Sequence, residues 1–537
     1  MNLHLKDKPE LKSKLKPRLK PKLKPELKPN LKTVCMFVYN SFENDSRVLK
    51  EACTLVEAGY QVHIIALWRK GLARLEKQHN ILVHRLDNIP IHIRLIGQKK
   101  LERLKKLVYG QPMPVPAART APEATIVPEA GTGPDAAQAV PAAKNATAAA
   151  DTAINSAADS TSNPDTDPDT DPATDSATNP IVNPSTDPVA GSRVGGTSYS
   201  NPYQKTRLSF IKFSVSTIKK ILFYSNFYME TDKYLKKKKI KADVYHCHDL
   251  NTLYIGQKLA KKHKASLVYD SHELYVYRNR PYIPPKIFHK KEEAFERKYI
   301  QRADAVITVS KSIAGYMEKK YNIDKPHLIM NAPKKNKAPE EIQYSLRKEL
   351  NLKDDQKILL YSGGITFSRG LDRVIESLTE MEDIFFVMMG YGQEGFKNYL
   401  KTVAVNHGVS HRMAFYGPVP SEKVTAWTAS ADLGIAPIEN ACLSYYYCAP
   451  NKIFEYIQGG LPVVASNFPD LKNIVEKNDI GLTCDISDPK KIARTVDKVF
   501  NKYTTYLNNV KKIKNRYCWE NEEIKLMELY EDLFAGK

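Results

Sequence analysis

The sequence predicts an α/β fold in which two Rossmann-like domains follow each other along the chain, each built around a parallel sheet. Two observations lead to this prediction. Short apolar strands alternate with amphipathic helices in both halves of the chain, and parallel strands need helical crossovers between them. The alternation pauses at Asn331-Ala332-Pro333 and a lysine-rich link and then restarts, so the domain junction is expected near residues 331–340.

The strands of the first domain are expected to be short and apolar. Their sequences are VCMFVY (34–39), QVHIIAL (61–67), DVYHCH (243–248), SLVYD (266–270) and AVITVS (305–310). One helix is expected to begin at Leu250 and another to lie around residues 290–301. The helix after the first strand has an apolar face that consists of Val48, Leu49, Ala52, Leu55 and Val56. This order predicts a parallel sheet with helices on both faces.

The second domain repeats the pattern. Its expected strands are KILLYSGGI (357–365), IFFVMMG (384–390), MAFYG (413–417), LGIAPI (433–438) and LPVVAS (461–466). A last amphipathic helix, 518–534, has an apolar face formed by Leu526, Leu529, Tyr530 and Leu533. Ligands of such sheets bind at the carboxyl ends of the strands, so functional residues are expected in the loops that follow them.

Two segments differ in composition from these domains. Residues 1–32 contain repeated LKPx units, whose prolines predict an extended, disordered basic tail. A tether to a membrane or another polyanion is the alternative interpretation of this tail. Residues 111–205 are rich in Ala, Pro, Thr and Asp and predict a disordered insertion in a surface loop.

The net charge of +21 is unevenly distributed. Residues 6–32 hold 11 basic and 3 acidic side chains, whereas residues 111–205 hold 4 basic and 11 acidic ones. The folded part is therefore strongly basic, which favours an anionic partner such as a nucleic acid, a membrane surface or a phosphorylated ligand.

Cysteine usage and hydropathy indicate the compartment. The seven cysteines are scattered without a CxxC pair, which is typical of reduced thiols. The sequence has neither a run of 18 apolar residues nor the apolar region of a signal peptide near its start. A cytoplasmic location is therefore expected.

The stretch PNKIFEYIQGGLPVVAS (450–466) is the strongest candidate for a binding element. It predicts a helix that Asn451 caps and that ends at two glycines before a buried strand. Lys452 and Glu455 are three residues apart and share a face. A lysine at a helix N-terminus suits a phosphate, and a carboxylate one turn later suits two vicinal hydroxyls. A simple surface ion pair is the alternative.

Two glycine-containing loops are further candidates. Gly363 and Gly364 end one expected strand, and Arg369 lies just before the next helix, where a diphosphate could bind. Gly390 and Tyr391 follow the next strand. Tyr391 could stack on a base or could simply cover the loop, and the sequence leaves both interpretations open.

These stretches, together with NDSRVLKEACTLVEAGYQVHIIA, ADVYHCHDLNTL and LVYDSHEL, resemble GT-B glycosyltransferases, and most of all glycosyltransferase family 4. The resemblance covers the chain from about residue 33 to the end, apart from 111–205. It implies an N-terminal acceptor domain (33–332), a nucleotide-sugar domain (336–517) and a C-terminal helix (518–537) that crosses back to the first domain, with a cleft between the two domains.

The resemblance also assigns roles to residues of the second domain. Arg369 and Lys452 would hold the donor diphosphate, and Glu455 would bind the donor ribose. The family's earlier glutamate falls at Tyr447 here, and its frequent Gly-Arg pair is Gly363-Gly364. These departures concern the contacts to the transferred sugar.

In the first domain, His248 and Asp249 end one strand, and the resemblance implies that His248 contacts the donor sugar near the reacting carbon. Packing or capping is the alternative role for this histidine. Asp270, His272 and Glu273 end the next strand and could be catalytic or could organise the loop. Asp45 and Arg47 would border the acceptor, although Asp45 could merely cap a helix.

The resemblance implies a retaining transfer from a UDP-, GDP- or ADP-sugar without a metal or another cofactor. Segments 93–109 and 207–241 are apolar on one side and lysine-rich on the other. They favour a peripheral enzyme on the inner face of the cell membrane, with a lipid-linked or cell-envelope glycan as acceptor. Ordinary helices that cover the first sheet are the alternative.

Of three rival functions, two stay open and the third is disfavoured. A sugar-nucleotide epimerase would share the donor site, and a degenerate nucleotide- or glycan-binding protein would fit Tyr447. A nucleic-acid partner is not expected, because the basic segments lack the base-stacking motifs of a known module.

Overall fold

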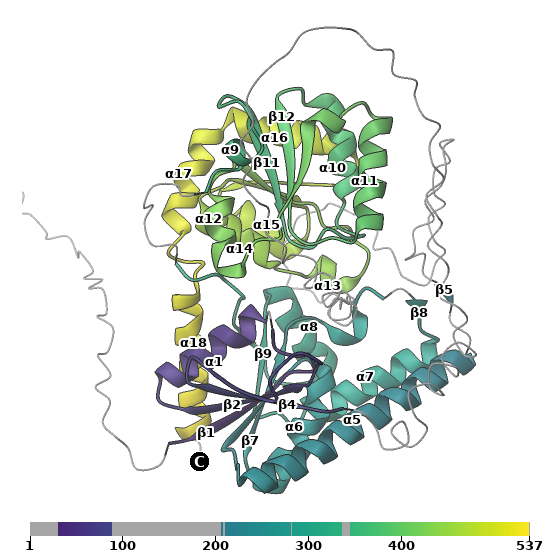
Figure 1. Cartoon of the computed structure of the whole chain (residues 1–537), viewed down its shortest axis with the longest axis vertical. Helices are drawn as coiled ribbons and strands as arrows, with labels where there is room; N and C mark the ends of the chain where they lie inside the picture. Colours follow the sequence, from purple (N-terminus) through teal and green to yellow (C-terminus); the bar gives the residue numbers. More distant parts are fainter. Residues whose placement is uncertain are drawn as a thin grey trace, which may run out of the picture.

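The computed structural model describes residues 31–43, 45–88, 206–207, 210–280, 282–335 and 344–535. The expected insert 111–205, the expected helix 93–109 and all but two residues of the expected tail lie outside these ranges. The described chain forms two α/β domains, stacked one above the other in Figure 1. Within these ranges, no helix is both long and apolar enough to cross a membrane.

The N-terminal domain contains an eight-stranded sheet in the described chain, in the order β10-β9-β7-β6-β1-β2-β4-β3. Its strands are β1 (Thr33–Phe37), β2 (Gln61–Leu67), β3 (Leu75–Gln78), β4 (Ile81–Leu86), β6 (Val244–His248), β7 (Ser266–Ser271), β9 (Ala305–Thr308) and β10 (His327–Leu328). After β1 the chain adds β2 on one side of β1, and later it adds β6 on the other side. The direction of winding therefore changes between β1 and β6, which is where ligands bind in such sheets.

Helices cover both faces of this sheet. They are α1 (Ser46–Glu57), α5 (Phe210–Lys238), α6 (Leu250–His263), α7 (Lys286–Ile300) and α8 (Lys311–Tyr321), with a short pair β5 (Thr206–Arg207) and β8 (Tyr282–Ile283) beside them. Alternate residues of β1 point to opposite sides, as a strand requires. Val34 and Met36 pack in one core and Cys35 and Phe37 in the other.

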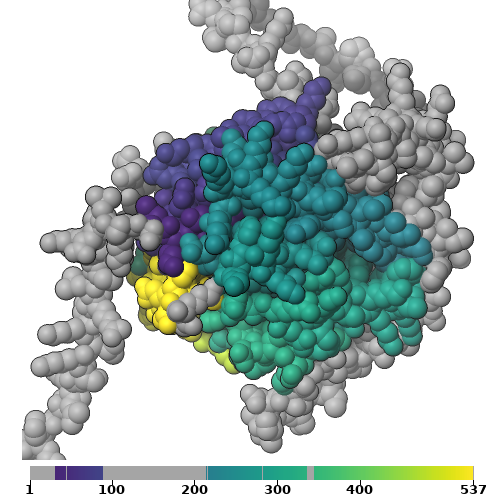
Figure 2. Space-filling view, turned by 90° about the horizontal axis from the view of Figure 1, so that it is seen from below, coloured from purple at the N-terminus to yellow at the C-terminus, as the bar shows by residue number. Residues whose placement is uncertain are grey.

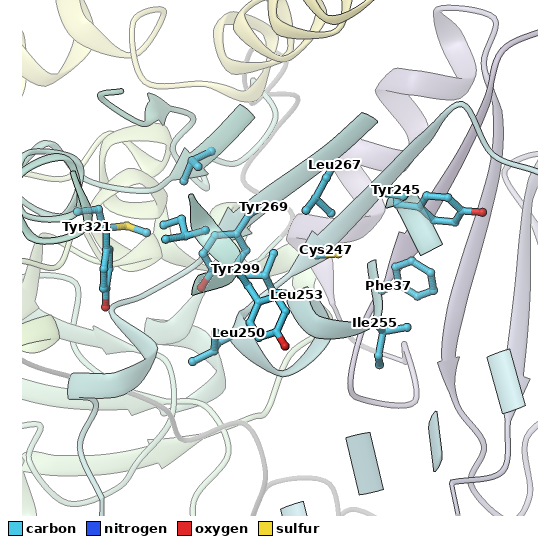
Figure 3. Close-up of a cluster of buried hydrophobic side chains, with 14 of the residues drawn as sticks. Phe37, Tyr245, Cys247, Leu250, Leu253, Ile255, Leu267, Tyr269, Tyr299 and Tyr321 are labelled. Atoms are coloured by element: carbon cyan, nitrogen blue, oxygen red, sulfur yellow. The ribbon is translucent and has the colours of Figure 1, made fainter. Parts of the chain in front are cut away.

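The second core contains a buried polar contact. Figure 3 shows part of this core, including Tyr269, Tyr299 and Tyr321 from β7, α7 and α8. The hydroxyls of Tyr269 and Tyr321 donate to the two oxygens of buried Glu296, at 3.0 and 2.6 Å. The apolar strands and helices thus pack around a carboxyl group that has its hydrogen-bond partners.

The C-terminal domain has a six-stranded sheet in which every described pairing is parallel, in the order β13-β12-β11-β14-β15-β16. The strands are β11 (Lys357–Ser362), β12 (Ile384–Met389), β13 (Met413–Tyr416), β14 (Leu433–Ala436), β15 (Val463–Ser466) and β16 (Gly481–Cys484). The direction of winding changes between β11 and β14. The helices are α9 (Leu346–Glu349), α10 (Leu371–Ser377), α11 (Glu394–Asn406), α12 (Val424–Thr428), α13 (Leu443–Tyr446), α14 (Asn451–Gly459), α15 (Pro469–Val475), α16 (Pro489–Asn501) and α17 (Tyr503–Ile513).

The last helix, α18 (Trp519–Ala535), leaves the C-terminal domain and packs on the N-terminal sheet beside α1. Figure 2 shows it in yellow at the edge of the N-terminal domain. Trp519, Leu526, Leu529 and Tyr530 are buried in the same core as Val34 and Met36. The chain passes from one domain to the other twice, after β10 and again just before α18. A hydrogen bond joins these two segments, because the backbone N–H of Trp519 donates to Pro333 O at 2.8 Å.

The structure confirms the α/β fold with two Rossmann-like domains and differs from the expected elements in several places. β3 pairs antiparallel with β4 at the sheet edge through His79 and Asn80, whose φ angles of 48° and 63° suit a tight hairpin turn. The sequence patterns missed the buried strand β4 and the short edge strands β10 and β16. Asn451 is the first residue of α14 and Pro450 is its N-cap, without a side-chain cap, so the expected Asn451 cap was wrong.

Candidate active site

A cleft with a volume of about 980 Å³ lies between the carboxyl ends of the two sheets. Its walls combine the loops after β1, β6 and β7 with the loop after β11 and the start of α14. In both sheets these loops flank the point where the direction of winding changes. The fold therefore brings two ligand-binding edges face to face.

The C-terminal wall begins with two glycines that pack against each other. Gly363 and Gly390 have φ angles of 129° and 150°, which other residues rarely adopt. A Cβ atom built on Gly390 would lie 2.0 Å from Gly363 O, so this position has no room for a side chain. The contact holds the loop after β11 in place. Gly363 and Gly364 line the cleft. Gly390 and Tyr391, which were also expected at the donor site, are not among the described residues that line it.

Two cations face the cleft beside these glycines. Lys452 Nζ lies 4.6 Å from the centre of the Tyr361 ring, and the Arg369 guanidinium lies 4.5 Å from that of Tyr445. Burial and the nearby Arg369 lower the pKa of Lys452 to about 7. The stacking on aromatic faces positions both cations without neutralising them. Both are thus available to an anionic ligand.

Glu455 is one turn further along α14. Its Oε2 accepts a hydrogen bond from Ser362 Oγ at 3.2 Å, and burial raises the pKa of its carboxyl group. The next residue, Tyr456, anchors the helix to the sheet, since its hydroxyl accepts from Ser362 N–H and donates to Ile435 O. This close packing depends on Gly434, where an added Cβ would lie 2.5 Å from the Tyr456 ring.

The N-terminal wall is organised by a buried ion pair. Arg47 donates from Nε and Nη2 to the two oxygens of Asp270, both at 2.9 Å, and from Nη1 to Ile329 O at 2.8 Å. Arg47 Nη2 also lies 3.1 Å from Glu51 Oε1. Burial alone would raise the pKa of Asp270, but Arg47 and His272 hold it well below its usual range. Asp270 is therefore a permanent anion behind the cleft.

Two histidines contact the same carboxylate. His248 Nδ1 lies 3.2 Å and His272 Nε2 3.0 Å from Asp270 Oδ2, and these two nitrogens lie 3.2 Å from each other. Because an ionised carboxylate only accepts hydrogen bonds, it favours the assignment in which each ring directs an N–H toward it. Burial lowers the pKa of His248, which keeps it neutral. Its Nε2 is then an unprotonated atom, buried and without a hydrogen-bond partner among the described residues. Asp249 and Asp270 outweigh burial and raise the pKa of His272 to about 10, so this ring is charged.

Behind the cleft, possible ligand atoms of Glu51, His246, His248 and Asp270 lie within 4.8 Å of one another, a grouping that could hold a metal ion. Arg47 bridges both carboxyl groups of this cluster and already supplies a positive charge. Burial and Asp270 raise the pKa of Glu51 to about 8, which makes it a poor metal ligand at neutral pH. This donor set fits the guanidinium better than a metal ion.

The remaining acceptor-side residues also line the cleft. Asp45 caps α1 through Val48 N–H at 3.2 Å and accepts from Asn40 Nδ2 at the same distance. Asp249 has φ 62° and ψ 163°, an unfavourable conformation for a non-glycine residue that costs on the order of 1–3 kcal/mol. It is held there because its N–H donates to Asp270 O, at 2.9 Å. Such strain is concentrated at functional sites.

Tyr447 does not belong to the described cleft lining. It is 8% exposed and packs in the N-terminal core, although it comes from the C-terminal domain. Its carbonyl accepts from Ser310 Oγ at 2.6 Å, and Ser444, in α13, accepts from Leu274 N–H at 3.3 Å. At this position the chain therefore has an interdomain contact.

Sequence reasoning missed Lys50, Tyr361 and Tyr445. Lys50 Nζ donates to Asn331 Oδ1 and Ala332 O, in the first segment that connects the domains. It also lies 5.0 Å from the centre of the Trp519 ring, in the second connecting segment. Its place on the face of α1 next to Arg47 was the available signal. Tyr361 and Tyr445 have no local sequence signal for this role, because their stacking on cations depends on tertiary structure.

Two family models match the chain. "Glycosyltransferase Family 4" matches residues 190–332 and "Glycosyl transferases group 1" matches residues 343–516, which together make more than half of the chain. The chain belongs to the GT-B glycosyltransferases of the family 4 type. The resemblance drawn from the cleft motifs is thereby confirmed.

Relatives and solved structures agree with this family. The uncharacterized glycosyltransferase MJ1607 of Methanocaldococcus jannaschii is 27% identical over 304 residues, 54% of this chain and 75% of that protein. The alpha-galactosylglucosyldiacylglycerol synthase of Streptococcus pneumoniae is 28% identical over 155 residues, 28% of this chain and 39% of that protein.

The solved structures extend the likeness to the whole fold. Sucrose-phosphate synthase from Thermosynechococcus elongatus has a TM-score of 0.59 at 13% identity and covers 94% of this chain and 100% of its own. Anabaena HepE in complex with UDP and glucose has a TM-score of 0.54 at 13% identity. The match covers 93% of this chain and 100% of that chain. This GT-B glycosyltransferase therefore shares its two-domain architecture with proteins of very different sequence.

Proposed function

We propose that this glycosyltransferase moves a sugar, with retention of anomeric configuration, from a nucleotide-diphosphate sugar to a lipid-linked or cell-envelope glycan. The observation that carries the proposal is the group of Arg369, Lys452 and Glu455 on one wall of the cleft. Two cations suit a diphosphate, and a carboxylate accepts hydrogen bonds from the two hydroxyls of a ribose. The UDP complex of Anabaena HepE supports a nucleotide donor.

The leaving diphosphate gains negative charge as the bond to the sugar breaks. Preorganised cations at this place stabilise the transition state more than the bound substrate. Arg369 and Lys452 take this role in the proposal, which therefore needs no metal ion. His248 Nε2, which is buried and has no hydrogen-bond partner among the described residues, is the group we assign to the transferred sugar. Family 4 membership supports retention.

The acceptor enters from the N-terminal wall, where Asp45 and Asp249 face the cleft. The name of the Streptococcus pneumoniae relative, a diacylglycerol glycolipid synthase, supports a lipid-linked acceptor. We place the enzyme in the cytoplasm, on the inner face of the cell membrane, where such acceptors are accessible.

A transfer assay tests this proposal. Purified protein is incubated with UDP-, GDP- or ADP-sugars and a lipid extract, and the anomeric configuration of the product is read by NMR. We expect one donor to release nucleotide together with a glycolipid of unchanged anomeric configuration, and EDTA to leave the rate unaffected. An inverted product contradicts retention. Conversion of the donor sugar without nucleotide release indicates an epimerase.

A further inference from the structure

The outer face of α5 carries several apolar side chains that stay exposed in the described part of the chain. Ile218, Leu222 and Met229 lie on one side of this helix at helical spacing and are 57%, 40% and 53% exposed. Ile221 beside them is 56% exposed. Globular proteins seldom leave several large apolar side chains exposed together.

The inward side of α5 packs on the neighbouring elements. Phe213 of α5 packs against Tyr282 of β8 and Phe288 of α7, with ring centres 5.8 and 4.6 Å apart. We call the four exposed residues of the outer face the α5 patch: Ile218, Ile221, Leu222 and Met229. Figure 1 shows α5 and α7 side by side at the lower right.

Positive charge surrounds the α5 patch. The three helices of this layer, α5, α6 and α7, contain 15 lysines and arginines and 5 acidic residues. Lys233 and Lys236 continue the apolar face of α5 by one and two turns and are exposed. Such a surface repels a second copy of itself but complements anionic lipid headgroups, while its apolar side chains reach the acyl boundary.

The inner side of α5 contacts the cleft. The rings of Tyr224 and Tyr39 meet edge to face with centres 5.4 Å apart, and Tyr39 lines the cleft. One helix thus separates the acceptor-side wall from the exposed apolar face. A lipid whose tail remains in a bilayer at this face would have only the width of α5 to cross.

We propose that the α5 patch and its lysines are the surface on which the protein docks to an anionic lipid bilayer. The route of the acceptor rests on the proposed function, whereas the docking itself is measured without any sugar substrate.

Sedimentation with vesicles tests the docking surface. The full chain is mixed with vesicles of phosphatidylcholine alone or with equal phosphatidylglycerol, at low and high salt. We expect salt-sensitive binding to the anionic vesicles only. The double variant Ile218→Glu, Leu222→Glu should weaken it about tenfold or more, because apolar burial is replaced by charge repulsion. Lys233→Gln with Lys236→Gln should weaken it about tenfold, through lost attraction to the headgroups.

The matched controls carry the same changes elsewhere. Val405→Glu with Ile524→Glu alters residues that are 67% and 53% exposed on other faces, and Lys472→Gln with Lys477→Gln removes exposed lysines of the C-terminal domain. Both should bind as the unchanged protein does. The proposal is overturned if no vesicle binding occurs, if patch and control variants bind alike, or if the patch instead mediates a dimer that Ile218→Glu, Leu222→Glu dissociates. If the protein still binds a nucleotide when one of these outcomes is observed, the docking proposal is wrong but the proposed function stands.

Discussion

Replacing Lys452 by alanine is expected to lower kcat for sugar transfer by about 10²–10³-fold, the usual effect of losing one group that stabilises transition-state charge. Lys452 Nζ lies against Gly363, where an added Cβ would be 3.2 Å away, and next to Arg369. Arg369 alone would then face the leaving diphosphate. The rate is measured as nucleotide release with the donor identified in the transfer assay, and Lys472→Ala, on the surface of the same domain, is the control.

Stability separates this role from a structural one. In the folded protein the pKa of Lys452 is about 7 instead of 10.5, so protonating the buried amine costs native-state stability at neutral pH. The Lys452→Ala variant should therefore melt no lower than the unchanged protein. A variant that melts lower while its kcat stays within about twofold of the unchanged protein's would contradict the assigned role.

The same pKa gives the pH dependence of donor binding. Only the protonated amine attracts a diphosphate, so affinity should fall as the pH rises above about 7. The bound anion in turn raises the pKa of Lys452, so protons are taken up on binding near and above this pH. Calorimetry in two buffers of different ionisation enthalpy measures this uptake, which Lys452→Ala should abolish.

Replacing Asp270 by asparagine is expected to destabilise the N-terminal domain by about 3 kcal/mol. Breaking a buried ion pair by removing one partner usually costs about 3–5 kcal/mol. The value should lie at the low end, because Glu51 is 3.1 Å from Arg47 and can ionise in place of Asp270. Urea denaturation followed by tryptophan fluorescence measures the change.

The control for Asp270→Asn is Asp383→Asn, which removes an exposed partner of Lys357 and should cost about 0–1 kcal/mol. The folded pKa of Asp270 is depressed, so its contribution is present at neutral pH and is lost as the pH falls through that pKa. Equal effects of the two substitutions at neutral pH would show that the buried network does not hold the cleft wall together.

The sequence patterns predicted the fold class because the apolar periods of strands and helices are local. The strand ends that carry His248 and Gly363 and the start of the helix that carries Lys452 all lie at the cleft. The edge strands β3, β10 and β16 were missed since they are short or only half buried. The buried strand β4 was also missed, because His84 and Arg85 interrupt its apolar run. The Asn451 cap failed because Pro450 already holds an extended conformation at the N-cap.

The network behind the cleft could not be predicted, since its partners are distant in sequence. Arg47 and Asp270 are 223 residues apart, and His246 Nδ1 meets the Tyr530 hydroxyl of α18 across 284 residues. Neither pairing has a local signal. The packing of Tyr447 in the N-terminal core likewise depends on how the two domains meet.

The central claim is that Arg369, Lys452 and Glu455 bind a nucleotide diphosphate. A thermal-shift screen with UDP, GDP, ADP and their sugars tests it most directly, with Glu455→Ala and the exposed-residue control Glu382→Ala alongside. A nucleotide at about 100 times its Kd should stabilise the protein by about 2.7 kcal/mol. The account predicts that one nucleotide raises the melting temperature of the unchanged protein and of Glu382→Ala but not of Glu455→Ala. If no nucleotide does so, or if Glu455→Ala responds like the control, the assigned donor site is wrong.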